Sequence, residues 1–237
     1  MRFRHFIITR FNVNIHPEKF IMRLNDNWLY ERFDFFSRFC LPSIAAQEEQ
    51  NFTWIILFDE DTPAHFKKMI NVFEKYSNIN VIYCGDFSTV MPRVKSFITE
   101  SSAGYDYILT TRLDNDDALS RKFVSTLHNV VGKILGDGSN SVSELYINFP
   151  NGYQYCNGDV YDFADITNAF VSLLETNRTL HTVYWVDHPS IYDKAPVAQV
   201  ETKPIYLQNV HDGNVYNYIR GQKIGGAELL NDFSLEL

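Results

Sequence analysis

Cysteine is scarce in this 237-residue chain, and that scarcity limits the class of protein it can encode. The three cysteines, Cys40, Cys84 and Cys156, are far apart and match no zinc-binding spacing. An odd number of cysteines without a recurring framework predicts reduced, mostly buried thiols. We therefore expect a cytoplasmic protein rather than a small domain held together by disulfides.

Long apolar runs and long basic runs are also missing. No apolar stretch approaches the ~18 residues of a transmembrane helix. The N-terminal segment MRFRHFIITRF is interrupted by polar residues and has no small-residue cleavage site after it, so it predicts a strand rather than a signal peptide. The net charge is −8, and no run of Lys or Arg is long enough to follow a phosphate backbone, so we expect no nucleic-acid partner.

The residues that are present predict one globular domain. Hydrophobic residues make up 45% of the chain and charged residues 21%, a balance that allows a substantial core. Apolar segments with strand spacing alternate with segments of helical spacing through the first half of the chain, which predicts a mostly parallel α/β sheet. The expected strands are 5–13, 52–59, 79–86 and 105–113. The expected helices are 28–47, 61–76, 88–101 and one from about 119, with Phe123, Leu127, Val130 and Ile134 facing inward.

The pattern changes after a loop predicted at 136–141. Asn-Gly pairs at 151–152 and 157–158 separate short apolar bursts and predict antiparallel hairpins. A helix is expected at 168–175, followed by strand-plus-loop segments at 182–192 and 203–218. We interpret the chain as one domain, 1–237, with a Rossmann-type nucleotide-binding half (1–135) and a mixed α+β acceptor half (136–237).

Three carboxylates and an amide follow the fourth predicted strand, in LTTRLDNDDALS (109–120). Ligands of open parallel sheets bind outside the carboxyl ends of the strands. Asp114 and Asp116 could converge on one hard divalent cation, Mg²⁺ or Mn²⁺, which would in turn hold a diphosphate. The alternative is a turn or helix cap, a position these residue types also favour, and Asp117 suits that role best. An EF-hand is excluded because Ala118 and Ser125 stand where its ligands belong.

Polar side chains at other predicted strand ends point to the same edge. Arg10 could approach a diphosphate or be an ordinary surface arginine, and Asp59 could accept hydrogen bonds from a base or ribose or be a loop carboxylate. Arg112 is expected to pair with a neighbouring carboxylate or to meet a phosphate. His211, late in the chain, could add a metal ligand or be structural.

Eight segments in this order resemble a family of bacterial rhamnosyltransferases, which are glycosyltransferases of the GT-A type. The segments are HFIITRFNV, RFDFFSRFCLPSIAAQ, FTWIILFDEDTP, YDYILTTRLDNDDAL, NGYQY, NAFVSLLE, TVYWVDH and VHDGN. They span nearly the whole chain, and TTRLDNDDAL is the most specific. One departure is Ala169 in NAF, where the family usually has Pro, and it affects no residue of the expected chemistry.

The resemblance implies where a donor would bind. The family's DxD motif falls on Asp114-Asn115-Asp116, which would bind Mn²⁺ or Mg²⁺, and a late histidine, here His211, would complete the metal site. The resemblance implies that Arg10, Asn12 and Asp59 hold the nucleoside. Together with Arg112 and Asp114, these are the residues that we expect to bind the nucleotide sugar.

The implied reaction moves a sugar, rhamnose by the family's label, from a nucleoside-diphosphate sugar to an acceptor hydroxyl. The acceptor would be a glycan or glycolipid of bacterial surface polysaccharide synthesis, and a lipid-linked acceptor would suit a peripheral position at the inner face of the plasma membrane. An inverting reaction needs a general base, and Asp187 is our first candidate because it follows an apolar segment in the acceptor half. His188 beside it could orient the base or the acceptor.

Two rivals differ in class. A non-catalytic nucleotide- or carbohydrate-binding domain of the same fold would bind nucleotide without turnover. A sugar-phosphate nucleotidyltransferase normally has a Gly-rich loop after its first strand, whereas TRFNVNIHPEK contains no glycine.

Overall fold

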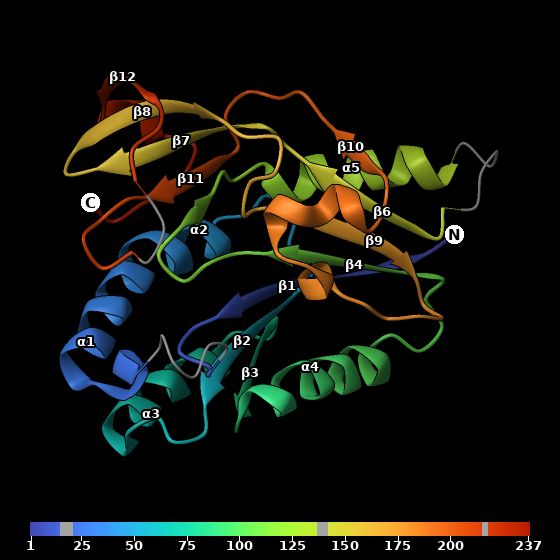
Figure 1. The fold of residues 1–237 in the computed structure, drawn as a ribbon, viewed down its shortest axis with the longest axis horizontal. Coiled ribbons are helices and arrows are strands. Elements are labelled where there is room, and N and C mark those ends of the chain that lie inside the picture. Colours follow the sequence, from blue (N-terminus) through green and yellow to red (C-terminus); the bar gives the residue numbers. More distant parts are fainter. Residues whose placement is uncertain (15–20, 137–141, 215–217) are drawn as a thin grey trace.

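The computed structural model describes residues 1–14, 21–136, 142–214 and 218–237 and contains two sheets (Figure 1). The larger sheet has the spatial order β10(Val197–Gln199), β6(Glu144–Asn148), β9(Ser172–Thr176), β4(Tyr107–Arg112), β1(Phe3–Arg10), β2(Thr53–Asp59), β3(Ile79–Cys84). The smaller sheet has the order β12(Gln222–Gly226), β8(Asp159–Ala164), β7(Asn151–Cys156), β11(Tyr206–Asn209), β5(Ala118–Leu119). Most of the predicted loop at 136–141 and part of the segment 203–218 lie outside the described residues.

Four neighbouring strands of the larger sheet, β4, β1, β2 and β3, are parallel. Ile8 in β1 is in register with Ile55 in β2 and Arg112 in β4, so the carboxyl ends of these strands lie at the same edge. Strand β9 runs antiparallel to both β4 and β6. The predicted α/β class with a mostly parallel central sheet is confirmed.

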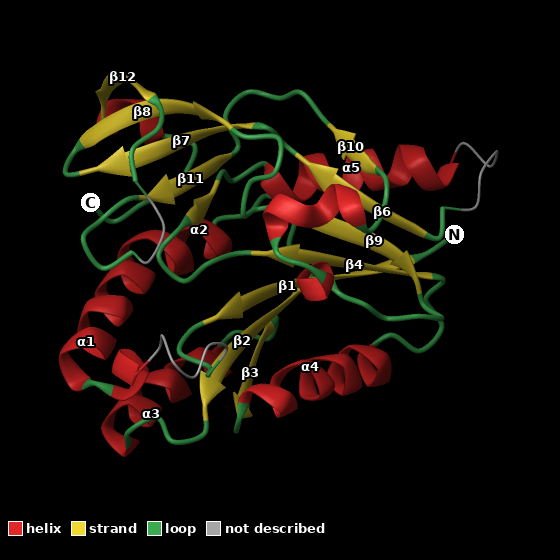
Figure 2. Ribbon diagram, in the orientation of Figure 1, coloured by secondary structure: helices red, strands yellow, loops and turns green. Residues whose placement is uncertain are grey.

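Helices cover both faces of this sheet (Figure 2). The α-helices are α1(Asp26–Phe35), α2(Leu41–Ala45), α3(Ala64–Ile70), α4(Phe87–Ser101) and α5(Phe123–Gly136). A π-helical turn, η2(Phe36–Cys40), joins α1 to α2, and the 3-10 turns are η1(Ile21–Leu24), η3(Asn71–Lys75), η4(Val183–Trp185), η5(His188–Asp193) and η6(Ala227–Leu230). No helix in these described ranges is long and apolar enough to cross a membrane.

Alternate residues of the central strands explain this layering. Ile7 and Ile56 are buried on the face covered by α1, η2 and α5, whereas Ile8 and Ile55 are buried on the face covered by α4. A strand buried on both faces is apolar at every position, which is why FTWIILFD has no polar alternation. The inward stripe of α5 contains Phe123 and Leu127, but it continues through Val131 and Leu135 instead of Val130 and Ile134, which are only partly buried.

Two predicted elements in the second half were wrong. The segment 168–175 supplies strand β9 instead of a helix: Leu173 and Leu174 are buried on opposite faces of the sheet, and a short doubly buried strand has the same apolar run as a helix. The segment 182–192 forms the turns η4 and η5 rather than a strand.

The first Asn-Gly pair was also misassigned, whereas the second was correct. Gly152 lies inside β7, where the Tyr206 ring packs so closely that an added Cβ would be 2.2 Å from its Cε2. Asn157 and Gly158, with φ of 50° and 91°, form the two-residue turn between β7 and β8.

Candidate functional site

The ends of β1 and β2 are tied together by buried polar side chains. Asn12 accepts the backbone N–H of Asp59 on Oδ1 at 3.0 Å and donates from Nδ2 to Thr62 Oγ1 at 3.0 Å. The Asp59 carboxylate accepts from Arg23 Nε at 2.9 Å and from the Asp61 N–H at 2.8 Å. Asn12 and Asp59 thus lie at the predicted edge, and the fold itself uses much of their hydrogen-bonding capacity.

The acidic turn after β4 is fixed by two contacts to neighbouring strands. Asn115 donates from Nδ2 to the carbonyl of Phe11 at 2.9 Å, and Asp117 accepts the N–H of Asn209 at 2.9 Å. Burial raises the pKa of Asp117, and the charges of two neighbouring aspartates raise it further. Asp117 is therefore a structural residue, although it links the turn to β11 instead of capping a helix.

Arg10, Arg112, Asp114, Tyr184 and His188 form what we call the arginine cluster. The Arg112 guanidinium contacts both oxygens of Asp114, at 2.9 and 3.3 Å, and the Arg10 guanidinium lies 4.3 Å from the centre of the Tyr184 ring. Burial by itself would raise the pKa of Asp114, but the charges of Arg112 and Arg10 outweigh it and hold the pKa below its usual value. The result is an ionised carboxylate held between two permanent cations.

The turn η5 brings the two predicted catalytic residues to this cluster. His188 Nδ1 donates to the carbonyl of Thr167, which leaves the lone pair on Nε2. Burial lowers the pKa of His188, and the nearby Arg112 charge lowers it further, so the ring is neutral at pH 7. Asp187 is exposed, and its charge acts on Arg112. Both residues are therefore close to the end of β4, and His188 has the chemistry of a proton acceptor.

Asp116 is the centre of a second group, which we call the Asp116 cluster. Its Oδ2 lies 2.5 Å from Arg32 Nη1, 2.9 Å from Asn214 Nδ2 and 3.0 Å from His211 Nε2. Phe35 stacks on the His211 ring at 4.0 Å between centroids. The structure thus joins the predicted pair Asp116 and His211, and it adds a buried arginine to them.

The donor set of the Asp116 cluster does not fit a divalent cation. The Gly213 N–H donates to His211 Nδ1 at 3.1 Å, so the ring proton is on Nε2, which points at Asp116. A metal ligand needs the lone pair on that nitrogen and an acceptor for the other N–H. Asp114, the other expected ligand, is bound by Arg112. Within the described parts of the chain, no three His, Cys, Asp or Glu side chains converge to hold a metal ion. The role of Mn²⁺ or Mg²⁺ stays a prediction.

Sequence reasoning missed Arg32, Tyr184 and Asn214. Arg32 carried no signal beyond its helix, because nothing in the spacing links it to an acid 84 positions away. Asn214 belongs to the recognised segment VHDGN, and Tyr184 to TVYWVDH, so both could have been found as polar members of those segments.

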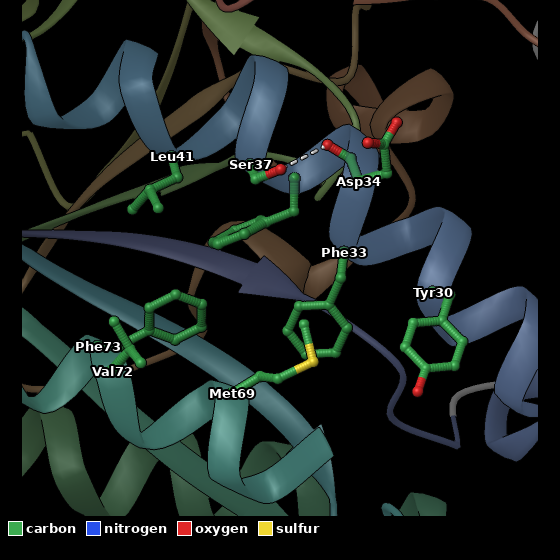
Figure 3. Close-up of a pocket in the computed structure, with 9 residues that line it drawn as sticks. Tyr30, Phe33, Asp34, Ser37, Leu41, Met69, Val72 and Phe73 are labelled. Carbon is green, nitrogen blue, oxygen red and sulfur yellow. Dashed lines mark hydrogen bonds between the residues drawn. The ribbon is translucent and has the colours of Figure 1, made fainter. Parts of the chain in front are cut away.

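An apolar groove of about 460 Å³ lies beside α1 (Figure 3). Trp28, Arg32 and Phe35 share one face of α1 because they are four and three residues apart. Tyr30 and Phe33, which line the groove, are on the opposite face, and Figure 3 shows Phe33 facing Met69 and Phe73 across it. The remaining walls come from η2, α2, α3 and η3, and they are mostly apolar. The polar chemistry is therefore concentrated at the strand ends and not in this groove.

A parallel sheet with arginines and acids at the carboxyl ends of its strands places this chain among the α/β proteins, whose ligands generally bind at that edge. A family model described as "Putative rhamnosyl transferase" matches residues 1–223. The chain belongs to this family of glycosyltransferases, which confirms the resemblance noted in its sequence.

Solved structures of similar fold include residues 1–349 of TarS from Staphylococcus aureus. The identity is 11% and the TM-score 0.48, over 88% of this chain and 60% of that one, so this chain spans less than two thirds of it. A "putative nucleotide-diphospho-sugar transferase" from Desulfovibrio desulfuricans is similar at 9% identity and a TM-score of 0.41, over 89% of this chain and 82% of that one. No curated protein matches the sequence.

Proposed function

We propose that this protein transfers a glycosyl group from a nucleoside-diphosphate sugar to an acceptor hydroxyl, and that the sugar is rhamnose. The observation that carries the proposal is the arginine cluster with His188, which gathers two cations and a neutral imidazole at the end of the parallel strands. Membership of the glycosyltransferase family supports it, and the family's description is the basis for rhamnose.

Arg10 and Arg112 would hold the diphosphate. Arg10 Nε has no hydrogen-bond partner among the described residues, although it is buried, so it keeps a donor for a ligand. Negative charge accumulates on the diphosphate as the glycosidic bond breaks, and fixed guanidinium groups stabilise that charge without reorganisation. Asp114 keeps Arg112 in place through its two-point contact.

His188 would accept the proton of the acceptor hydroxyl. Its Nδ1–H is fixed by the Thr167 carbonyl, and its lowered pKa keeps Nε2 unprotonated at neutral pH. Asp187, which the sequence suggested first as the general base, is the exposed residue directly before His188 and would orient the acceptor. The acceptor itself would be a glycan or glycolipid, and a lipid-linked one would bring the protein to the inner face of the plasma membrane.

Binding and turnover with a panel of nucleoside diphosphates and nucleotide sugars test this proposal. We expect one nucleoside diphosphate to bind, and R112Q to weaken it about 10- to 100-fold, the cost of a charge-assisted contact. R121Q is the matched control, because Arg121 forms an exposed ion pair with Asp232, a residue outside the arginine cluster. Incubation with the matching nucleotide sugar and an acceptor should release the nucleoside diphosphate.

Two results would contradict the proposal in different ways. If no nucleoside diphosphate binds under any condition, the strand ends are not a donor site. Binding without release of product from any nucleotide sugar would instead favour a non-catalytic binding domain, the rival from a different class.

A further inference from the structure

Both carboxylates of the Asp-x-Asp unit already have an arginine as counter-ion. Asp114 is paired with Arg112, and Asp116 with Arg32. Asp117 is buried, and its carboxylate already accepts the backbone N–H of Asn209, so it does not face a ligand. The acidic stretch therefore does not present free negative charge of the kind that attracts a divalent cation.

Arg32 is built into the site instead of lying on the surface. Only 6% of the residue is exposed; Nη1 donates to Asp116, and Nη2 donates to the carbonyl of Gly213 at 2.6 Å. The guanidinium lies 5.1 Å from the centre of the Trp28 ring, which limits its movement. Its Nε is buried and has no hydrogen-bond partner in the described parts of the chain. A buried cation with an unused donor has the chemistry of an anion site.

We propose that Arg32 supplies the positive charge beside Asp116, so that the nucleoside diphosphate binds and leaves without a divalent cation. This inference rests on the proposed function. Arg32 would act together with Arg10 and Arg112, so that three guanidinium groups face the diphosphate.

The hydrogen bonds of His211 favour the same conclusion. The imidazole Nε2 lies 3.0 Å from Asp116 Oδ2, and Nδ1 accepts the Gly213 N–H at 3.1 Å, so both ring nitrogens have partners within the chain itself. A divalent ion bound to Asp116 and to Nε2 of His211 would need the proton on Nδ1 instead. The Nδ1–H would then point at the Gly213 N–H, and two donors would face each other. The ion would also stand next to the guanidinium that contacts the same carboxylate oxygen, and like charges in a buried site repel strongly.

The inference is tested first on the wild-type protein. Calorimetry measures its affinity for the preferred nucleoside diphosphate, once with excess EDTA and once with added Mn²⁺ or Mg²⁺. We expect the affinity in EDTA to equal that with metal, within about threefold, since the counter-charge belongs to the chain. R32Q should weaken binding at least about tenfold with and without metal, the loss expected for one charge-assisted contact. R32K retains the charge but not the planar donors, so its affinity for the nucleoside diphosphate should lie between those of R32Q and the wild type.

R38Q is the matched control, because Arg38 is the next arginine along the same helical segment and makes exposed contacts, an ion pair with Asp34 and a hydrogen bond to the carbonyl of Glu236. It should bind as the wild type does. The wild-type comparison does not depend on whether R32Q folds, and melting curves report the folding of each variant.

Binding that disappears in EDTA and returns in proportion to added Mn²⁺ or Mg²⁺ would overturn this inference and leave the proposed function intact. Affinity unchanged in a folded R32Q would also overturn it. Absence of binding with and without metal would overturn the proposed function itself, and this inference with it.

Discussion

His188 gives the sharpest test of the chemistry, and the substitution H188N isolates its role. The asparagine amide can still donate to the Thr167 carbonyl, the contact that Nδ1 makes, but it has no counterpart of the Nε2 lone pair. Loss of a general base typically lowers kcat by about 10²–10⁴, which is ~2.7–5.5 kcal/mol of transition-state stabilisation. The cost to folding should be only about 1 kcal/mol, because the retained hydrogen bond holds the turn.

The assay follows release of the nucleoside diphosphate across the pH range. The active form of His188 is the neutral ring, whose pKa is lowered, so kcat/KM should be level above ~6.5 and fall only at lower pH. In H188N that acid limb should disappear, together with most of kcat, while KM changes little. A folded H188N with wild-type kcat, alongside a D187N variant that is inactive, would refute the assignment and make Asp187 the base.

Three further predictions concern charge, pH and packing. R112K should bind nucleotide more weakly than the wild type but better than R112Q in calorimetry, because lysine keeps the charge and loses the two-point contact; equal affinities of the lysine and glutamine variants would contradict this. Burial lowers the pKa of His5 well below its usual value, so the native state binds no proton there when the unfolded chain does. Urea unfolding should therefore show stability that is full above ~6.5 and falls by up to ~1.4 kcal/mol per pH unit below it, and a flat profile between pH 7 and 5.5 would contradict the reasoning. G152A should lower the free energy of unfolding, measured with urea, by about 1–3 kcal/mol, because its Cβ would overlap the Tyr206 ring. The control G132A, where an added Cβ meets open space on α5, should leave that free energy unchanged or raise it. The same result for both variants would refute the clash.

The first half of the fold could be predicted because its strands and helices differ in length and period. FTWIILFD is a short apolar run closed by acids, and the helix after Asp86 shows a clear apolar stripe. The second half was harder for a physical reason. Leu173 and Leu174 are both buried, one on each face of β9, and such a strand has no alternation to separate it from a helix.

The site could be predicted as far as it depends on strand ends. Arg10, Asp59 and Arg112 end parallel strands, and the rule that ligands bind there placed them at one edge before any coordinates were known. His188 also lies near this edge, and the role of base that we propose for it is the one that the sequence suggested for Asp187. Spacing gave no indication of which nitrogen of the ring would be free, because that depends on the Thr167 carbonyl from a separate loop.

Local sequence shows where acids are, but it does not show which cations they face. Asp116 and Asp114 have the spacing of a metal motif, and that interpretation assumes that their charge is available. In the folded chain, Arg32 reaches Asp116 from a helix that is distant in sequence, and Arg112 turns back on Asp114. A carboxylate with its own guanidinium positions a cation for an anionic ligand, whereas a free one attracts a metal ion. The same four letters, DNDD, can therefore encode either kind of site, and the partner arginines decide between them.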